Sequence, residues 1–365
     1  MTQKMNQEIN YHELGAMLCE HLNILLISGK SLEKTQIKQK LSLDSPQFHR
    51  FSEFSENPTI QEVILAKTHL EKVNATAIVA IGGGTAIDIA KLTKYYKGND
   101  LSTDETTPPI VDNISSIPIF VIPTTFGSGS ESTSFAVMYI QEKKFSITHP
   151  DLLPNFYLLD PDLSRSLPLY TKASACLDAL CQAIESYWAN SATLESRQDA
   201  IFAIIHIAKY FEDFITAPTS RVETIIAEAS NRAGKAINVT KTTAPHALSY
   251  FISQQYNISH GHAVALCMLN MFKINEEKAY QLADYNLIKT LREIYSALGV
   301  SCAIEARMIY KYFLMKAHLT SSFSELGLSS IDKVKQVINS VNLDRLKNHP
   351  IELKPNDLKH IFIDE

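Results

Sequence analysis

Short runs of apolar residues recur along the first part of the chain, up to about residue 165, with polar or helix-like sequence between them. The runs cover residues 23–29, 77–81, 117–122 and 156–160. Continuous apolar runs of this length are typical of strands that are buried on both faces, and such strands are usually parallel and linked by helices. The pattern therefore predicts an α/β domain built on a mostly parallel sheet.

The pattern changes beyond residues 160–162, where strand-like runs stop and apolar residues recur at helical spacing. We predict two domains: an α/β domain at residues 1–161 that binds a nucleotide, and an all-α domain at residues 162–365. A single large α/β domain with added helices is the alternative, because a length of 365 residues sets only a soft prior on domain number.

Composition places the chain among ordinary globular proteins. Apolar residues make up 45% and charged residues 20%, which excludes a disordered or collagen-like chain. The net charge of -5 disfavours nucleic acid as a partner. The five cysteines are scattered, which favours a reducing compartment. We see no signal-like or membrane-spanning apolar stretch, so we expect a cytoplasmic protein that does not bind membranes.

Three glycines follow the predicted strand at residues 77–81. Gly82, Gly83 and Gly84 stand before a helix-like sequence, where the first helical N–H groups would be open to an anion because no Cβ covers them. This arrangement predicts a pyrophosphate site. Thr85 and Asp88 also fit a helix-capping pattern, which would explain both residues without a ligand.

A second strand end carries small and hydroxyl-bearing residues. The run at residues 117–122 is followed by a segment that includes Thr124, Thr125 and Ser128. Ligands of open α/β sheets bind beyond the carboxyl ends of the strands. Two such strand ends in one domain favour a single nucleotide-binding site.

The helical part offers candidate metal ligands. Asp178, Gln182 and Glu185 form a polar stripe on one predicted helix, and His246 and His260 follow further along the chain. An aspartate and two histidines match a three-ligand divalent metal site that is open to substrate. We expect Gly261 to allow a sharp turn that aims His260 inward. Ordinary surface or structural roles for these residues are the alternative.

Five motifs, in the same order, resemble those of the iron-containing (group III) alcohol dehydrogenase family. They are GGGTAIDIAK at 82–91, IPTTFGSGSE at 122–131, Asp-Pro at 160–161, DALCQAIE at 178–185, and the histidines of segment 246–261. The resemblance implies a Rossmann-like amino-terminal domain that binds NAD(P)H and a helical carboxyl-terminal domain that holds one divalent metal ion. It also implies a homodimer that interconverts a small alcohol and an aldehyde.

The resemblance assigns roles to single residues. The residues that it implies contact the cofactor are Gly82, Gly83, Gly84, Thr85, Asp88, Thr124, Thr125, Ser128 and Lys144. It also implies that Ser52 lies near the cofactor ribose. The implied metal ligands are Asp178, His246 and His260. A serine stands at position 52 where relatives often carry a ribose-binding aspartate, so NADH and NADPH both stay open.

Two positions depart from the family's pattern. Gln182 replaces a fourth ligand, usually a histidine; an amide oxygen suits harder cations, so Fe²⁺ and Zn²⁺ are both candidates. Tyr250 stands where many members carry a histidine that is proposed to relay a proton. Tyr250 or His262 would then take that task as the catalytic acid.

The residues around both departures resemble the family's phosphonoacetaldehyde reductases, which implies reduction of phosphonoacetaldehyde to 2-hydroxyethylphosphonate. Lys235, Asn238, Lys241 and Thr242 precede His246, and ammonium and hydroxyl donors suit an anionic substrate. These lysines are equally compatible with solvated helix ends. Two other functions stay open: a dehydroquinate-synthase-like lyase that uses NAD catalytically, and a nucleotide-binding protein without a metal.

Overall fold

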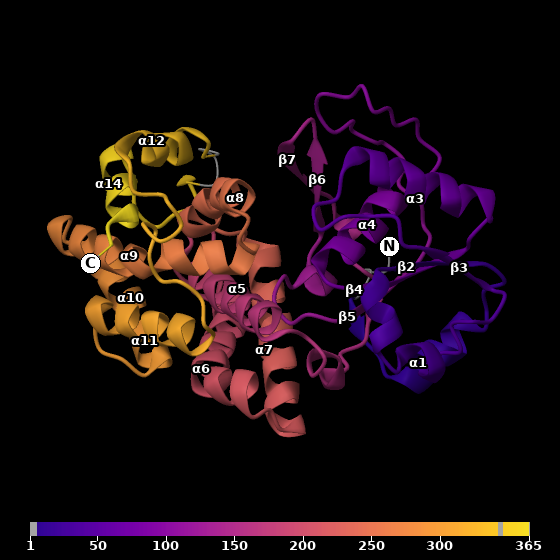
Figure 1. The fold of residues 1–365 in the computed structure, drawn as a ribbon, viewed down its shortest axis with the longest axis horizontal. Helices are drawn as coiled ribbons and strands as arrows, with labels where there is room; N and C mark the ends of the chain where they lie inside the picture. The colour runs from indigo at the N-terminus through magenta and orange to yellow at the C-terminus, as the bar shows by residue number, and fades with distance from the viewer. Residues whose placement is uncertain (1–5, 342–345, 365) are drawn as a thin grey trace. The chain divides into compact units, whose positions relative to one another are not determined.

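The computed structural model describes residues 6–341 and 346–364. The chain divides into two compact units (Figure 1), the first made of Met1–Thr125 with Gly129–Ser166 and the second of Phe126–Ser128 with Leu167–Glu365. The first unit is α/β and the second is helical. This confirms the predicted fold class of an α/β domain followed by an all-α domain.

The first unit is built on a parallel sheet, which in the described part of the chain has six strands in the order β1-β8-β5-β4-β2-β3. Each of the four apolar runs forms a strand of this sheet. The strands are β1 (Gln7–Glu8), β2 (Ile24–Ser28), β3 (Phe48–Phe51), β4 (Ala77–Gly82), β5 (Ile119–Pro123) and β8 (Phe156–Tyr157).

Helices cover both faces of this sheet, which explains why its central strands are apolar throughout. Leu25 and Ile27 of β2 belong to the apolar cluster that includes α3 (Ile60–Lys72) and α4 (Gly84–Tyr96). Ile24 and Leu26 point the other way, into the cluster that includes α1 (Tyr11–Leu18) and α2 (Ile37–Lys40). Successive side chains of a strand alternate between faces, so both sets must be apolar.

An antiparallel hairpin, which the sequence pattern did not predict, follows β5. It consists of β6 (Phe135–Ile140) and β7 (Lys143–Thr148). Its two-residue turn, Gln141 and Glu142, has positive φ angles of 48° and 64°. Such turns usually carry Asn or Gly, and their absence here removed the sequence signal.

The second unit is a set of packed helices around α5 (Leu169–Trp188), which contacts α6 (Leu194–Thr216), α7 (Ser220–Thr240), α9 (His260–Gln281) and α10 (Tyr285–Leu298). The other α-helices among the described residues are α8 (Ala244–Tyr256), α11 (Ala303–Lys316), α12 (Ile331–Asn339) and α14 (Pro355–Lys359). One apolar cluster runs through the unit. Among the described residues, no helix is long and apolar enough to cross a membrane.

Candidate functional site

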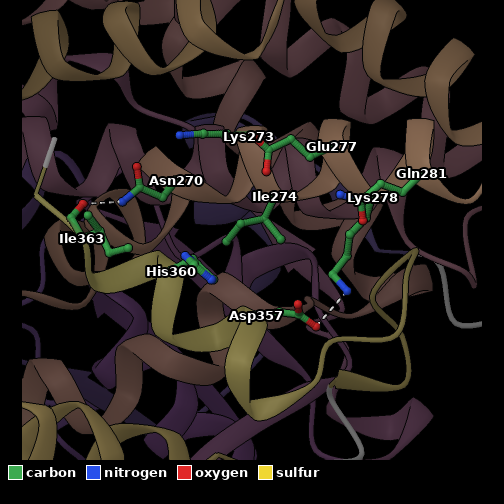
Figure 2. A pocket seen from close by; sticks show the side chains of 9 residues that line it. All are labelled: Asn270, Lys273, Ile274, Glu277, Lys278, Gln281, Asp357, His360 and Ile363. Carbon is green, nitrogen blue, oxygen red and sulfur yellow. Dashed lines mark hydrogen bonds and ion pairs between the residues drawn. The ribbon is translucent and has the colours of Figure 1, made fainter.

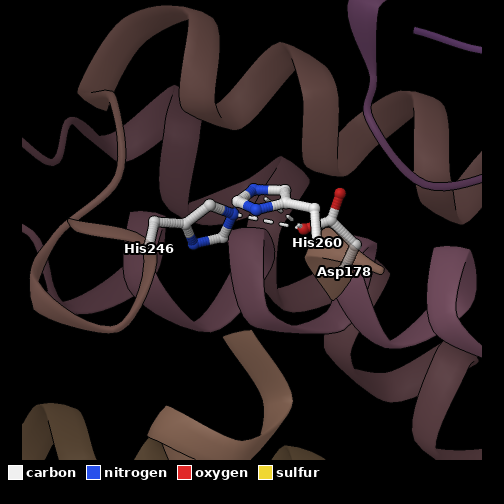
Figure 3. Close-up of side chains that lie close together, drawn as sticks. All are labelled: Asp178, His246 and His260. Atoms are coloured by element: carbon white, nitrogen blue, oxygen red, sulfur yellow. Dashed lines mark ion pairs between the residues drawn. The ribbon is translucent and has the colours of Figure 1, made fainter. Parts of the chain in front are cut away.

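Three predicted ligands, from three helices of the second unit, come together in space. Asp178 of α5, His246 of α8 and His260 of α9 each offer a ligand atom, and these atoms lie within 4.8 Å of one another. Asp178 Oδ1 is 3.2 Å from His246 Nε2 and 4.0 Å from His260 Nε2. Both imidazole rings point toward the Asp178 carboxylate (Figure 3).

Close packing of α9 on α5 brings two of these ligands together. Gly261 lies inside the first turn of α9 and does not form the sharp turn that we expected from the sequence. A Cβ at Gly261 would lie 2.1 Å from the Ser174 carbonyl oxygen and 2.8 Å from Asp178 Cβ. Glycine is therefore needed for the close approach of the two helices rather than for a turn.

The chemistry of the side chains at this point fits a divalent cation. Among the described residues, Asp178 Oδ1, Gln182 Oε1 and His246 Nε2 are buried atoms without a hydrogen-bond partner. Buried polar atoms are rarely left unsatisfied in proteins. A carboxylate oxygen, an imidazole nitrogen and an amide oxygen together form a donor set that suits Fe²⁺ or Zn²⁺, so the residues fit the metal that the family resemblance implies.

Electrostatics favour ionised ligands here. Burial alone would raise the pKa of Asp178, but the adjacent His246 ring and the charge of His260 lower that pKa below its usual range. Burial alone would lower the pKa of His246, but the carboxylates of Glu185 and Asp178 outweigh it and raise the pKa to about 9. Near neutral pH and without a cation, Asp178 is therefore a carboxylate and His246 is protonated, so a bound cation would take the place of the His246 proton.

Two residues to which the sequence analysis gave no role contact the histidines. Glu185 Oε2 accepts a hydrogen bond from His246 Nδ1, and Ser249 Oγ lies 3.4 Å from His260 Nδ1. Glu185 is fully buried. A carboxylate within an otherwise apolar stretch of helix was the available sequence signal, because a buried charge needs a specific partner.

The two proposed proton donors have different surroundings. The Tyr250 ring stacks on the His260 ring, with 5.2 Å between ring centroids. His262 is buried, with Nε2 2.8 Å from the Thr320 carbonyl oxygen and Nδ1 3.5 Å from the Tyr170 hydroxyl. Burial lowers the pKa of His262 despite the hydrogen bond to Thr320.

The predicted cofactor residues of the first unit gather at the carboxyl edge of the sheet. Gly82 pairs with Pro123 and Ser28 with Ile81, so the parallel strands β2, β4 and β5 end together. Their following loops touch, since a Cβ at Gly83 would lie 3.1 Å from Thr125 Oγ1. Such an edge is where nucleotides bind in open α/β sheets. Gly82, Gly83, Gly84, Thr124, Thr125 and, after β3, Ser52 all lie at or just beyond these strand ends.

The helix-capping interpretation of Thr85 and Asp88 is wrong. The N-cap of α4 is Gly83, and no side chain caps the helix. Thr85 Oγ1 donates to the Glu56 carbonyl oxygen, and Asp88 accepts from Ser130 Oγ at 2.6 Å. This hydrogen bond links Asp88, on α4, to the segment that follows β5.

Lys144, Lys235 and Lys241 differ in their surroundings. Lys144 lies on β7, and its charge acts on Asp88. The charge of Lys235, on α7, acts on Asp199 of α6. Lys241 and Thr242 form the turn between α7 and α8, directly before the helix that carries His246, and Asn238 lies one turn earlier on α7. Ser128 belongs to the short segment that clusters with the second unit.

A separate pocket of about 340 Å³ lies between α9 and the end of the chain (Figure 2). Its charged lining residues include Lys278 and Asp357, which form an ion pair of 2.8 Å. The pocket contains no residue that the sequence analysis assigned to a site.

Comparison with known proteins decides the family. Residues 5–161 match the family described as iron-containing alcohol dehydrogenase, and residues 172–363 match its carboxyl-terminal domain. The chain belongs to the iron-containing alcohol dehydrogenase family. Its family is one of NAD(P)-linked oxidoreductases that use a divalent metal ion, as the resemblance implied, and Asp178, His246 and His260 could hold such an ion.

Several individual relatives are similar over large parts of the chain. Phosphonoacetaldehyde reductase of Streptomyces viridochromogenes is 29% identical over 67% of this chain and 65% of the relative, slightly under two thirds of its length. Choline dehydrogenase of Bacillus subtilis is 27% identical over 84% of this chain and 77% of the relative. The solved sulfoacetaldehyde reductase of Bifidobacterium kashiwanohense with NAD⁺ has a TM-score of 0.85 and 22% identity, covering 98% of this chain and 95% of that one.

Proposed function

We propose that this protein reduces a small anionic aldehyde with NAD(P)H, and that phosphonoacetaldehyde is its substrate and 2-hydroxyethylphosphonate its product. The observation that carries the proposal is the convergence of Asp178, His246 and His260 on one point, in a chain of this family. The similarity to a phosphonoacetaldehyde reductase supports the choice of substrate.

The proposed roles divide between residues 1–161, which would bind the dinucleotide, and residues 162–365, which would bind metal and substrate. When bound, the cation would polarise the aldehyde oxygen and the reduced nicotinamide would supply the hydride. Asp178, His246 and His260 would hold the cation, and Gln182 Oε1 would offer a fourth, neutral oxygen.

We propose Tyr250 rather than His262 as the donor of the proton that completes the alcohol. Tyr250 stacks on the ligand His260. Both ring nitrogens of His262 lie beside groups of the chain, at Thr320 and Tyr170. Tyr250→Phe should therefore reduce turnover much more than His262→Gln does, because a positioned general acid contributes about 10²- to 10⁴-fold to rate.

We propose that the turn residues Lys241 and Thr242, with Lys235 and Asn238 on α7, hold the anionic group of the substrate. The turn leads directly into α8 and His246, so its donors are close in sequence to the metal ligand. Hydrogen bonds to charged groups contribute about 1.5–3 kcal/mol, or roughly 10- to 100-fold in affinity.

The test is NADH and NADPH oxidation with aldehydes of equal length, with and without a phosphonate group. Lys241→Ala should raise the KM for the phosphonate aldehyde at least about tenfold and leave the KM for the neutral aldehyde unchanged. Lys289→Ala is the control, because that lysine is 79% exposed on α10. Equal KM changes for both aldehydes would refute the anion site.

The same assay separates the other functions. A lyase that uses NAD catalytically shows no net oxidation of NAD(P)H, whereas a reductase oxidises one molecule for each aldehyde. A nucleotide-binding protein without a metal shows neither activity nor bound metal in elemental analysis. We also propose that the protein is cytoplasmic, consistent with its five unpaired cysteines. We propose further that it is a homodimer, and light scattering of the purified protein tests this by measuring the mass.

A further inference from the structure

Glu185 sits behind the metal ligands and is one of the most enclosed charged residues of the second unit. Its side chain has no exposed surface. Oε1 accepts hydrogen bonds from Thr243 N at 2.8 Å, from Thr243 Oγ1 at 2.9 Å and from His246 N at 3.3 Å. Oε2 accepts from His246 Nδ1. The carboxylate thus contacts both the backbone and the ring of a ligand residue.

All four neighbouring groups are donors, and this fixes the chemistry of position 185. An ionised carboxylate is an acceptor at both oxygens and satisfies every one of them. Because His246 Nδ1 must donate to Glu185, the lone pair available for a cation is on Nε2. That nitrogen is the one that faces Asp178 Oδ1, at 3.2 Å.

The contacts also tie the first turn of α8 to α5. Trp188 Nε1, on α5, donates to Thr243 Oγ1 at 3.1 Å, and Thr243 Oγ1 donates to Glu185, also on α5. Asp178 lies on the same helix. One helix therefore provides a metal ligand and fixes the position of a second ligand, His246.

The other ligand histidine, His260, contacts a neutral group. The hydroxyl of Ser249 lies 3.4 Å from His260 Nδ1. Charge-assisted hydrogen bonds are shorter and stronger than neutral ones. The Glu185 carboxylate is thus a charged partner of His246, and the Ser249 hydroxyl is a neutral partner of His260.

We propose that Glu185 is a positioning residue that fixes the ring orientation and the tautomer of His246 and so sets the affinity of the site for a divalent cation. The inference rests on the proposed metal site. Substitution of groups that support ligand histidines typically weakens metal binding 10- to 100-fold, and the buried carboxylate at Glu185 is expected to act at the upper end of that range.

Glu185→Gln tests the inference because an amide cannot accept from all four donors. In one orientation its NH₂ group faces His246 Nδ1, which favours the ring tautomer with the proton on Nε2 and blocks the ligand atom. In the other orientation the NH₂ group faces Thr243 N and His246 N, so the hydrogen bonds from these two backbone groups to position 185 are lost. Either way we expect Zn²⁺ affinity, measured by competition with a chelator, to fall about 100-fold.

Two variants serve as controls. Ser249→Ala removes the neutral partner of His260 and should weaken Zn²⁺ binding less than Glu185→Gln does. Glu185→Asp keeps the charge but withdraws the carboxylate by one methylene, so it should weaken Zn²⁺ binding while the His246 proton stays on Nδ1. Nitrogen NMR of ¹⁵N-histidine protein reports the tautomer, which a purely structural role would not change.

The outcomes are distinct. If wild-type protein binds no Zn²⁺, the proposed metal site fails and not only the role of Glu185. If wild type binds Zn²⁺ and Glu185→Gln binds it equally well, or Ser249→Ala loses as much affinity, the inference alone is overturned. If Glu185→Gln does not fold, Glu185→Asp decides: unchanged Zn²⁺ affinity contradicts the inference, and weaker binding with an unchanged tautomer supports it.

Discussion

Lys241 has a backbone conformation that side chains other than glycine rarely adopt. Its φ is 63° and its ψ is -174°, in a region that is occupied almost only by glycine. Hydrogen bonds to the carbonyl oxygens on either side of Lys241 stabilise this conformation. Asn348 Nδ2 donates to Thr240 O at 2.7 Å and to Thr242 O at 3.2 Å, and Ser191 Oγ donates to Thr240 O at 2.8 Å. Strain is thus retained in the turn that leads to His246.

Comparison of Lys241→Gly with Lys241→Ala measures this strain. Both variants lack the ammonium group, but only glycine relaxes at positive φ, so the glycine variant should be more stable by about 1 kcal/mol or more, after allowance for its larger unfolded-state entropy. Urea unfolding gives the difference. Greater stability of the alanine variant would show that the turn is unstrained. Both variants should lose selectivity for anionic aldehydes equally.

His349 makes stability depend on pH. Burial lowers the pKa of His349 to about 3 from an unfolded value of 6.5, so the folded chain keeps the ring neutral while the unfolded chain protonates it. The contribution of the neutral, buried His349 ring to the free energy of unfolding is therefore complete above pH 6.5 and is lost as pH falls toward 3. Between pH 7.5 and pH 5 the loss is about 2 kcal/mol.

The measurement is urea unfolding of wild type and His349→Gln at both pH values. Glutamine can still donate to Asn275 Oδ1, which His349 Nε2 contacts at 2.8 Å, but it does not titrate. On acidification from pH 7.5 to pH 5, the free energy of unfolding of the variant should therefore fall by about 2 kcal/mol less than that of wild type, whatever the absolute stability of the variant. Equal losses for the two proteins would mean that His349 is already protonated in the fold.

At the scale of single residues, the sequence revealed the groups with distinctive chemistry. Asp178, His246 and His260 stood out because few residue types bind transition metals, and the structure brings them together. Glu185 belonged to the predicted polar stripe but received no role, because its partners lie at positions 243 and 246 and no local pattern indicates them. Contacts between distant segments are fixed by packing rather than by local pattern.

At the scale of elements, strands that are buried on both faces were predictable and half-buried ones were not. β2, β4 and β5 read as continuous apolar runs because helices cover both sides of them. β3 has the sequence Phe-His-Arg-Phe and lies at the edge of the sheet, so its pattern is mixed. The same limit applies to Gly261, whose function depends on the neighbouring helix and not on its own backbone conformation.

Gly261→Ala tests the close approach of α9 and α5. The new Cβ would meet the Ser174 carbonyl oxygen at 2.1 Å, so the start of α9 must move away and take His260 from Asp178. We expect a loss of about 1–3 kcal/mol in stability and clearly weaker Zn²⁺ binding by chelator competition. Gly15→Ala is the matched control, since nothing lies within 4 Å of its Cβ and alanine favours helices.

At the scale of the whole molecule, the predicted cofactor residues and the candidate metal ligands fall in different units. Of the predicted cofactor residues, only Ser128 falls in the second unit, and Asp178, His246 and His260 all do. The change of hydrophobic pattern near residue 160 predicted this sequence of an α/β unit and a helical unit, because each fold class has its own periodicity. If the proposed roles hold, the arrangement separates dinucleotide binding from metal binding along the chain.

This separation predicts what metal removal does. Chelation should abolish NAD(P)H oxidation with any aldehyde, because the cation would polarise the carbonyl, yet leave the Kd for NADH, followed by nicotinamide fluorescence, unchanged. His260→Ala should behave like the stripped protein. Added Zn²⁺ or Fe²⁺ should restore turnover to stripped wild type but not to the variant, and the cation that restores more activity identifies the better fit to Gln182. Full turnover by stripped protein would contradict the metal-assisted reaction, while a much weaker Kd for NADH would contradict the separation of the two sites.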